Sequence, residues 1–365
     1  MTIADLDTPA LIADLDIVQR NIDRMAELAR RGGKALRPHL KTHKCPDFAR
    51  LQIKAGSAGV TVAKLAEAET MADAGIDDLF VANVLAGSAK AERLAILARR
   101  ARVAVGVDSV EVAAPLSLAA SRAGIMLPVH IEVDTGLGRC GVRSAQAALD
   151  LARAIDDLPG LRLAGLYTHE GHVYRATLGE AVAACAIAAQ RMRDAAHTLR
   201  THGLPCETVS VGSTPGAAAM SREPGIDELR PGVYIFNDRM QVELGSARED
   251  DCALSVLATV ISRPEPDMAI LDAGSKALSG DRGERGSRHG AIAGLPEAAI
   301  DWLSEEHAHV DLRETAPSER PRVGDRVRVV PYHACACVNL HAEIVAVRGE
   351  RVESALPVAA RGQMR

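Results

Sequence analysis

The amino-acid sequence predicts an α/β protein, a (β/α)₈ barrel followed by a β-rich C-terminal domain. Eight short apolar runs alternate with segments of helical periodicity between residues 34 and 236, and this alternation implies a parallel sheet. Eight repeats at this length favour a closed barrel over an open doubly wound sheet. No glycine-rich dinucleotide loop follows an early strand, which weakens the open alternative further. Beyond about residue 245 the pattern changes to strands joined by charged turns.

Each barrel strand is predicted from a run of β-branched and aliphatic residues, and each helix from a stretch rich in Ala, Leu, Glu and Arg. The helices are expected to stop at breakers such as "AG" at 74–75 and "HG" at 202–203. The predicted strands are 34–41, 58–63, 78–83, 102–108, 127–134, 161–169, 208–214 and 228–236. The predicted helices are 18–30, 45–55, 65–74, 90–100, 110–123, 145–155 and 179–201.

The chain is expected to form two domains. Residues 18–245 carry the barrel, and residues 246–365 carry the β-rich domain, with runs such as "CALSVLATVISR" and "DRVRVVPYH". Residues 1–17 include "DTPALIADL" and are expected to lend the second domain a strand, which makes that domain discontinuous. Residues 274–294 are polar and rich in glycine, and we predict a long loop there.

Composition and charge exclude several classes of protein. The 365 residues carry a net charge of -5 and only 2% aromatic residues, which argues against a nucleic-acid partner. No apolar run approaches the ~20 residues of a membrane span, and the N-terminus lacks the pattern of a signal peptide. Seven cysteines, an odd number without small-scaffold spacing, suggest reduced thiols. These features predict a cytoplasmic protein of the size of an enzyme.

Polar side chains gather at the carboxyl ends of the predicted strands, where the reactive groups of a parallel barrel cluster. In "LRPHLKTHKCP", Lys41 ends the first strand among basic neighbours, and like charges nearby favour its neutral amine. A neutral amine can form a Schiff base with an aldehyde. The alternative is a solvated basic patch. The other polar residues at these ends are His43, Asn83, Asp108, Asp134, Arg139, Tyr167, His169, Ser213, Thr214 and Tyr234.

Two motifs after the seventh and eighth strands predict a phosphate site. "VSVGSTPGA" places Gly212, Ser213 and Thr214 at the end of one strand, before a helix, and "RPGVY" adds Gly232 and Tyr234 after the next. Small residues with free N–H groups can cradle a phosphate, and these two loops are its usual place in such barrels. The alternative for either motif taken singly is a tight structural turn.

A metal site is predicted in "PYHACACVNLH". His333 and Cys335, two residues apart in an extended segment, would point the same way and could chelate one ion. An imidazole and a thiolate suit Zn²⁺, and two protein ligands leave positions open for a substrate. The alternative is a structural strand with buried cysteines.

Eight motifs, met in order along the chain, resemble the D-serine dehydratase and D-threonine aldolase family. They are "RPHLKTHK", "AKLAEAE", "EVDTGLGRCGV", "GLYTHEGHVY", "GSTPG", "ELRPGVYIFND", "LDAGSKALSGD" and "PYHACACVNL". The resemblance runs from about residue 6 to about residue 345. It implies an alanine racemase-like (β/α)₈ barrel with a β domain, and the cofactor pyridoxal 5'-phosphate.

The resemblance also implies roles by position. The family's cofactor lysine corresponds to Lys41, and its metal pair corresponds to His333 and Cys335. Arg139 is a candidate for the residue that faces the pyridine nitrogen. The positions that match contacts to the cofactor ring are Tyr167, His169 and Tyr174, and those that match phosphate contacts are Gly212, Ser213 and Tyr234.

The implied activity is that of a lyase acting on D-3-hydroxy amino acids, and the H-x-C pair favours dehydration, since aldolase-like members more often carry H-x-D. In elimination, Lys41 removes the Cα proton and the metal helps the β-hydroxyl leave. D-serine, D-threonine or D-threo-3-hydroxyaspartate would then give a 2-keto acid and ammonia. In the aldolase alternative, a base such as His169 or His172 takes the hydroxyl proton, and glycine and an aldehyde form.

Two further alternatives stay open, namely a cofactor-binding protein without turnover and a racemase. A racemase needs a second base, and Tyr332 is the only tyrosine of the β-rich region. The expected metal is zinc, with manganese or magnesium as alternatives. By analogy with the fold we expect a homodimer.

Overall fold

The computed structural model describes residues 1–283 and 288–365, which fall into two compact units. The barrel unit comprises Arg24–Lys41, Pro46–Gly232 and Gly362–Arg365. The β unit comprises Met1–Asp23, Thr42–Cys45 and Val233–Arg361. Across the described ranges, no helix has both the length and the apolar character that crossing a membrane requires.

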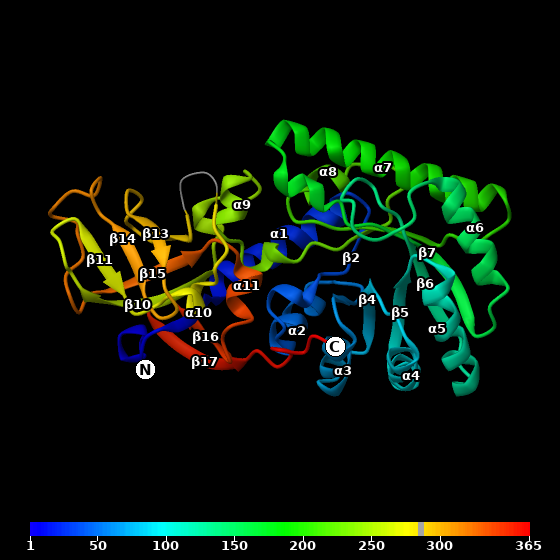
Figure 1. Ribbon diagram of the computed structural model, residues 1–365, viewed down its shortest axis with the longest axis horizontal. Coiled ribbons are helices and arrows are strands. Elements are labelled where there is room, and N and C mark those ends of the chain that lie inside the picture. The colour runs from blue at the N-terminus through cyan, green and yellow to red at the C-terminus, as the bar shows by residue number, and fades with distance from the viewer. Residues whose placement is uncertain (284–287) are drawn as a thin grey trace. The chain divides into compact units, whose positions relative to one another are not determined.

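Eight parallel strands form the curved sheet of the barrel unit (Figure 1). Their spatial order is β2-β9-β8-β7-β6-β5-β4-β3. The two ends of this order are joined by backbone hydrogen bonds of 2.8 Å, from Ala58 N to Leu36 O and from Thr61 N to Pro38 O. The predicted (β/α)₈ barrel is therefore confirmed. The strands are β2 Ala35–Leu36, β3 Val60–Val62, β4 Asp78–Val84, β5 Arg102–Val107, β6 Leu127–Glu132, β7 Leu161–Tyr167, β8 Thr208–Val211 and β9 Glu228–Leu229.

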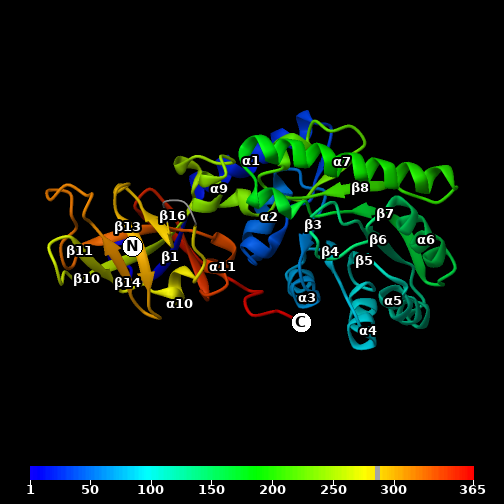
Figure 2. The same cartoon turned by 45° about the horizontal axis from the view of Figure 1, so that its top comes forward.

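Helices cover the outer side of this sheet, as α3 to α6 show in Figures 1 and 2. The α6 helix illustrates why they form: the Ser144 hydroxyl caps its N-terminus by accepting the Ala147 N–H at 3.1 Å, and one apolar face is buried. The helices are α1 Leu15–Arg31, α2 Pro46–Lys54, α3 Leu65–Asp73, α4 Ser88–Leu97, α5 Val110–Ala123, α6 Ala145–Asp156, α7 Leu178–Thr201 and α8 Ala217–Met220.

The first and last barrel strands are shorter than predicted, and proline is the reason. Residues 34–41 were expected to form one strand, but β2 ends at Leu36 and Lys41 lies in a 3₁₀ turn, η2 Leu40–Thr42. Pro38 has no N–H to extend the ladder. The eighth predicted strand, 228–236, likewise ends at Leu229, and Tyr234 lies in the 3₁₀ turn η4 Val233–Ile235.

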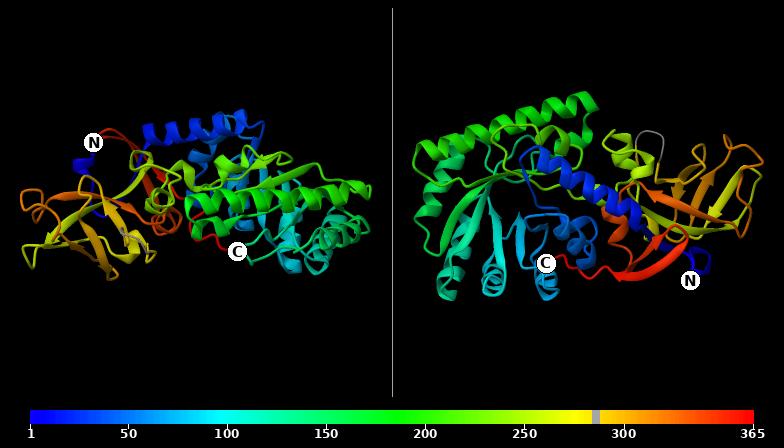
Figure 3. Two further views of the ribbon diagram at one scale, coloured as in Figure 1. Left: turned by 90° about the horizontal axis from the view of Figure 1, so that it is seen from above. Right: turned by 180° about the vertical axis from the view of Figure 1, so that it is seen from behind.

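The β unit contains a nine-stranded mixed sheet, seen from two further sides in Figure 3. The order β13-β14-β11-β10-β1-β16-β17 forms its main path, and β15 pairs with both β10 and β12. The N-terminal strand β1 is antiparallel to β10 and parallel to β16. The strands are β1 Ala10–Asp14, β10 Leu254–Ser262, β11 Met268–Leu271, β12 Gly290–Ile292, β13 Ala299–Leu303, β14 Ala308–Asp311, β15 Arg326–Pro331, β16 Glu343–Arg348 and β17 Arg351–Pro357.

Three short helices interrupt the β unit: α9 Arg239–Glu243, α10 Ser275–Leu278 and α11 Ala334–Val338. The prediction of an extended segment through His333 and Cys335 is wrong, because His333 is the N-cap of α11 and Cys335 lies in its first turn. The predicted loop 274–294 contains α10 and β12, while its residues 284–287 lie outside the described residues.

Candidate active site

The predicted site residues form two groups, one in each unit. Lys41, His169 and the loop at 212–214 belong to the barrel unit, whereas His333 and Cys335 belong to the β unit. Each group contains further buried charged residues that sequence reasoning did not single out.

Lys41 lies in the barrel unit near two histidines that remain neutral. Its backbone N–H donates to His39 Nδ1 at 3.3 Å. Burial, followed by the charge of Lys41, lowers the pKa of His39 well below its usual value and that of His169 to about 3. Arg37 is held by Glu228 at 2.7 Å and by Asp78 at 2.5 Å. The sequence argument that flanking cations keep Lys41 neutral is therefore wrong for His39 and Arg37, since one is neutral and the other is paired.

A buried carboxylate orders the loop after β8. Glu170 is fully buried, and it accepts the Gly212 N–H at 3.1 Å and the Ser213 hydroxyl at 2.7 Å. Ser213 Oγ also accepts the Gly216 N–H at 3.1 Å. The signal that could have revealed Glu170 is its place between His169 and His172, directly after the sixth predicted strand.

The same loop leaves one polar atom for an anion. Thr214 Oγ1 is buried and has no hydrogen-bond partner within the described part of the chain. A Cβ at Gly212 would lie 2.7 Å from Arg230 Cβ, so only glycine fits this position. The orphaned hydroxyl and the close-fitting loop suit a phosphate group. The helix that follows, α8, has only four residues, so the loop rather than a helix dipole would have to hold it.

Tyr167 is buried beneath the barrel end. Its hydroxyl donates to Glu132 Oε2 at 2.6 Å, and a Cβ at Gly106 would collide with its ring. Burial raises the pKa of Glu132, although the bond from Tyr167 opposes this, and burial together with Glu132 raises the pKa of Tyr167 well above its usual value. Arg139 approaches Glu132 at 3.7 Å and is half-exposed. Tyr167 thus fills the barrel, and Arg139 stands at its edge.

The remaining predicted residues are spread over several turns. His172 lies in η3 Gly171–Arg175, with its Nδ1 buried and unpartnered among described residues. The Tyr174 ring lies 6.4 Å from that of His169, measured between ring centroids. Gly232 is buried at the end of its segment of the barrel unit, while Tyr234 is a buried residue of the β unit.

His333 and Cys335 form a thiol–imidazole pair in the β unit. Asp281 Oδ2 lies 2.6 Å from His333 Nδ1, and Thr42 Oγ1 lies 3.2 Å from Cys335 Sγ. Burial alone would lower the pKa of His333, but the hydrogen bonds with Cys335 and Asp281 and the charges of Cys335 and Asp238 raise it to about 10. Asp281 occupies Nδ1, which leaves Nε2 of the ring for a metal ion.

A second carboxylate fixes the helix that carries this pair. Asp238 is fully buried and accepts the Gln241 N–H at 2.9 Å and the Ala334 N–H at 2.8 Å, so it caps both α9 and α11. Burial raises its pKa to about 6. The described residues include no group of three or more metal-binding side chains. The donor set is thus an imidazole and a thiol, which fits zinc with open coordination positions.

Known proteins resemble this chain over nearly its whole length. The alanine racemase N-terminal domain family matches residues 13–240, and the putative serine dehydratase domain family matches residues 253–347. The D-threonine aldolase of Arthrobacter sp. is 38% identical over 368 residues, which cover 99% of this chain and 94% of that protein. The D-threo-3-hydroxyaspartate dehydratase of Delftia sp. (strain HT23) is 39% identical over 355 residues, 92% of each chain.

A solved structure agrees with these matches. The crystal structure of D-threonine aldolase from Filomicrobium marinum has a TM-score of 0.94 and 35% identity, covering 100% of this chain and 98% of that one. An aldolase and a dehydratase stand at almost equal sequence identity, so identity alone does not separate the two reactions.

Proposed function

The chain belongs to the family of lyases that join an alanine racemase N-terminal domain to a serine dehydratase domain. From this membership we propose that the protein is a pyridoxal-phosphate- and metal-dependent dehydratase of D-3-hydroxy amino acids. D-serine, D-threonine or D-threo-3-hydroxyaspartate would yield a 2-keto acid and ammonia. The observation that carries the proposal is the thiol–imidazole pair of Cys335 and His333, with Asp281 on the far nitrogen of the imidazole.

Residues of the barrel unit would hold the cofactor. Lys41 would supply the amine that binds its aldehyde, and the 212–214 loop would hold its phosphate, where Thr214 Oγ1 is buried without a partner among described residues. His169 and Tyr174 would flank its ring, as the resemblance implies, and Arg139 would approach from the edge of the barrel. When bound, the cofactor supplies an electron sink for the carbanion formed at Cα.

The protein's own side chains would then determine which bond of the substrate breaks. Lys41 takes the Cα proton, and an amine can do so once it is neutral. His333 and Cys335 would hold the metal, which would supply Lewis-acid stabilisation to the departing β-hydroxyl, and the protonated Lys41 would return the proton with which the hydroxyl leaves as water. The enamine that is released takes up water and gives the 2-keto acid and ammonia.

The electrostatics of His169 make this residue a poor base for retro-aldol cleavage, which leaves His172 as the other candidate for that role. Cleavage requires a base that takes the hydroxyl proton, and a base works best with a pKa near the working pH. Burial and the charge of Lys41 lower the pKa of His169 to about 3, which makes it a weak proton acceptor. Its Nδ1 is also in contact with Gly212 O.

Product analysis tests the proposal. Purified protein with pyridoxal phosphate and Zn²⁺ or Mn²⁺ would be given D-serine and D-threonine, and the products identified by NMR. Pyruvate or 2-oxobutyrate with ammonia is the expected result. The Lys41→Ala variant should lose both the visible absorbance of the bound cofactor and the activity, while Lys54→Ala, at an exposed site on α2, should keep both.

The alternative function is a D-threonine-type aldolase, which the 38% identical Arthrobacter enzyme favours. Glycine and acetaldehyde from D-threonine would establish it and overturn the dehydratase proposal. A cofactor-binding protein without turnover would give no product from either substrate, and a racemase would give a mixture of the D- and L-enantiomers with no keto acid and no glycine.

We also propose that the enzyme works in a reducing, cytoplasmic compartment as a homodimer. All seven cysteines are free thiols, which suits such a compartment. The dimer rests on analogy with the fold, and sedimentation analysis of the purified protein tests it by its mass.

A further inference from the structure

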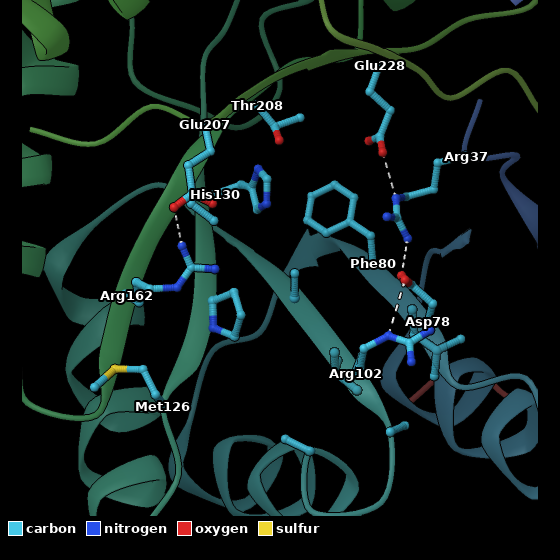
Figure 4. A pocket seen from close by; sticks show the side chains of 17 residues that line it. Arg37, Asp78, Phe80, Arg102, Met126, His130, Arg162, Glu207, Thr208 and Glu228 are labelled. Carbon is cyan, nitrogen blue, oxygen red and sulfur yellow. Dashed lines mark hydrogen bonds and ion pairs between the residues drawn. The ribbon is translucent and has the colours of Figure 1, made fainter. Parts of the chain in front are cut away.

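The end of the barrel unit from which its strands start contains a cavity of about 490 Å³ (Figure 4). Bulky Val, Ile and Leu side chains usually fill a barrel of this kind. Here Ala104 and Ala164 line the cavity, and Ala104 pairs with Phe80 across β5 and β4. These two small side chains, on β5 and β7 to either side of β6, thus leave space that is large enough for a small ligand.

Two sets of charged side chains stand on opposite sides of this cavity, with Phe80 and His130 between them (Figure 4). On one side Glu228, Arg37, Asp78 and Arg102 are linked in a row, and on the other Arg162 pairs with Glu207 at 2.5 Å. Three arginines and three carboxylates therefore line the cavity, and their formal charges sum to zero.

Arg102 is the least firmly paired of these charges. Its contacts to Asp77 and Asp78 are both 3.5 Å, and 70% of its side chain is exposed. Exposed ion pairs of this kind contribute little to stability, so a ligand can displace them at small cost. Arg37, by contrast, is bound on both sides and mostly buried, which keeps its wall of the cavity fixed.

His130 offers a polar group at the floor of the cavity. Its Nδ1 is buried without a hydrogen-bond partner among described residues, while the residue as a whole is only partly buried and lines the cavity. A neutral imidazole has one donor and one acceptor nitrogen, and a buried N–H without a partner is rarer than an unused lone pair. Nε2 is therefore the protonated nitrogen and can donate to a ligand.

We propose that this cavity, away from Lys41, binds a small amino acid zwitterion. Its carboxylate would lie against Arg102, with the His130 Nε2–H as a further donor, and its ammonium would lie against Asp78. A zwitterion leaves the balanced charge of the walls unchanged, whereas a simple anion or cation would add one uncompensated charge. The inference is independent of the reaction proposed above.

The test uses the holoenzyme and N,N-dimethylglycine. This compound is a zwitterion that keeps one N–H, but as a tertiary amine it cannot condense with an aldehyde. Binding would be measured by saturation-transfer NMR and isothermal titration calorimetry. We expect saturable binding that Arg102→Gln and Ala104→Leu each weaken at least tenfold, the first by removing a charge and the second by filling the space. The matched control is Arg100→Gln, since Arg100 pairs with Asp73 on the surface and does not line the cavity.

Each outcome decides the matter. Loss of binding in Arg102→Gln and Ala104→Leu, with retention in Arg100→Gln, supports the site. Acetate or dimethylammonium binding as tightly as dimethylglycine would overturn the zwitterion preference. Absence of saturable binding in the wild type, or binding that survives Ala104→Leu in a folded protein, would overturn the site. Should Ala104→Leu fail to fold, Arg102→Gln decides alone, because this exposed side chain is not needed for folding.

Discussion

Replacing His130 by glutamine is expected to make the protein less sensitive to acid. Burial lowers the pKa of His130 to about 3, and the charges of Arg230, Arg37 and Arg162 act in the same direction, while Glu207 opposes them. In the native protein this imidazole is therefore still neutral at pH 5. In the unfolded chain, a histidine with its usual pKa near 6.5 takes up a proton at that pH.

The sign and the size of the effect follow from this difference. Because the folded pKa is depressed, the unfolded state binds the additional proton, so stability is lost as the pH falls from about 6.5 toward about 3. At pH 5 the loss amounts to about 2 kcal/mol, since the pH lies about 1.5 units below the unfolded pKa and each unit is worth ~1.36 kcal/mol. Glutamine has no such proton to bind. The variant loses instead a ring contact, since the centroids of His130 and Phe80 lie 5.0 Å apart, which costs about 1 kcal/mol at any pH.

Urea denaturation of wild type and His130→Gln at pH 7.5 and 5.0 gives the free energies of unfolding. The pKa of His169 is also lowered to about 3, but His169 is present in both proteins and cancels in the difference. Between pH 7.5 and pH 5.0, the free energy of unfolding of the variant is expected to fall by about 2 kcal/mol less than that of the wild type. A gain below about 0.5 kcal/mol would refute a neutral His130 in the native state. Independently, NMR of ¹³C-labelled histidines should show that the resonance missing from the variant does not titrate in this range.

Three further predictions concern the two groups of site residues. Glu170→Gln should weaken pyridoxal phosphate binding about tenfold in a fluorescence titration, because an amide cannot accept both the Gly212 N–H and the Ser213 hydroxyl. Asp238→Asn should lower zinc affinity about tenfold in a chelator competition, since its amide leaves one helix cap unmade. Cys335→Ala should abolish zinc binding and product formation but keep the visible absorbance of the cofactor, and loss of that absorbance would contradict separate metal and cofactor roles.

Local pattern was sufficient to predict the barrel. The central strands β4 to β7 were expected within a few residues of their observed bounds, because each is a continuous apolar run between breakers. The breakers also act as expected: Gly75, after α3, and Gly203, after α7, adopt left-handed conformations with φ of 82° and 77°. Strand bounds and helix ends depend on residues that are close in the sequence, and a sequence pattern contains this information.

The carboxylates that organise the site could not be predicted in this way. Asp281 lies 52 residues from His333, and Asp238 lies 96 residues from Ala334, the residue it caps. An acidic residue in a polar stretch is indistinguishable from any solvated charge until folding buries it. Glu170 was missed for another reason: it directly follows His169, and the proposed function of this motif was assigned to the histidine. Partnerships over such separations are a property of the tertiary structure.

Two prolines explain why the first and the last predicted barrel strands end early, before Lys41 and Tyr234. Pro38 and Pro231 each lack a backbone N–H two residues beyond the end of a two-residue strand, so each removes one hydrogen bond from the ladder, although the His39 N–H still donates to Pro231 O at 3.0 Å. The chain then turns into short 3₁₀ segments, and these carry Lys41 and Tyr234. A strand would alternate such residues between the inside and the outside of the barrel, whereas a 3₁₀ turn places them without that constraint. If Lys41 holds the cofactor as proposed, substituting Pro38 by a residue that extends β2 is expected to reposition Lys41 and weaken cofactor binding.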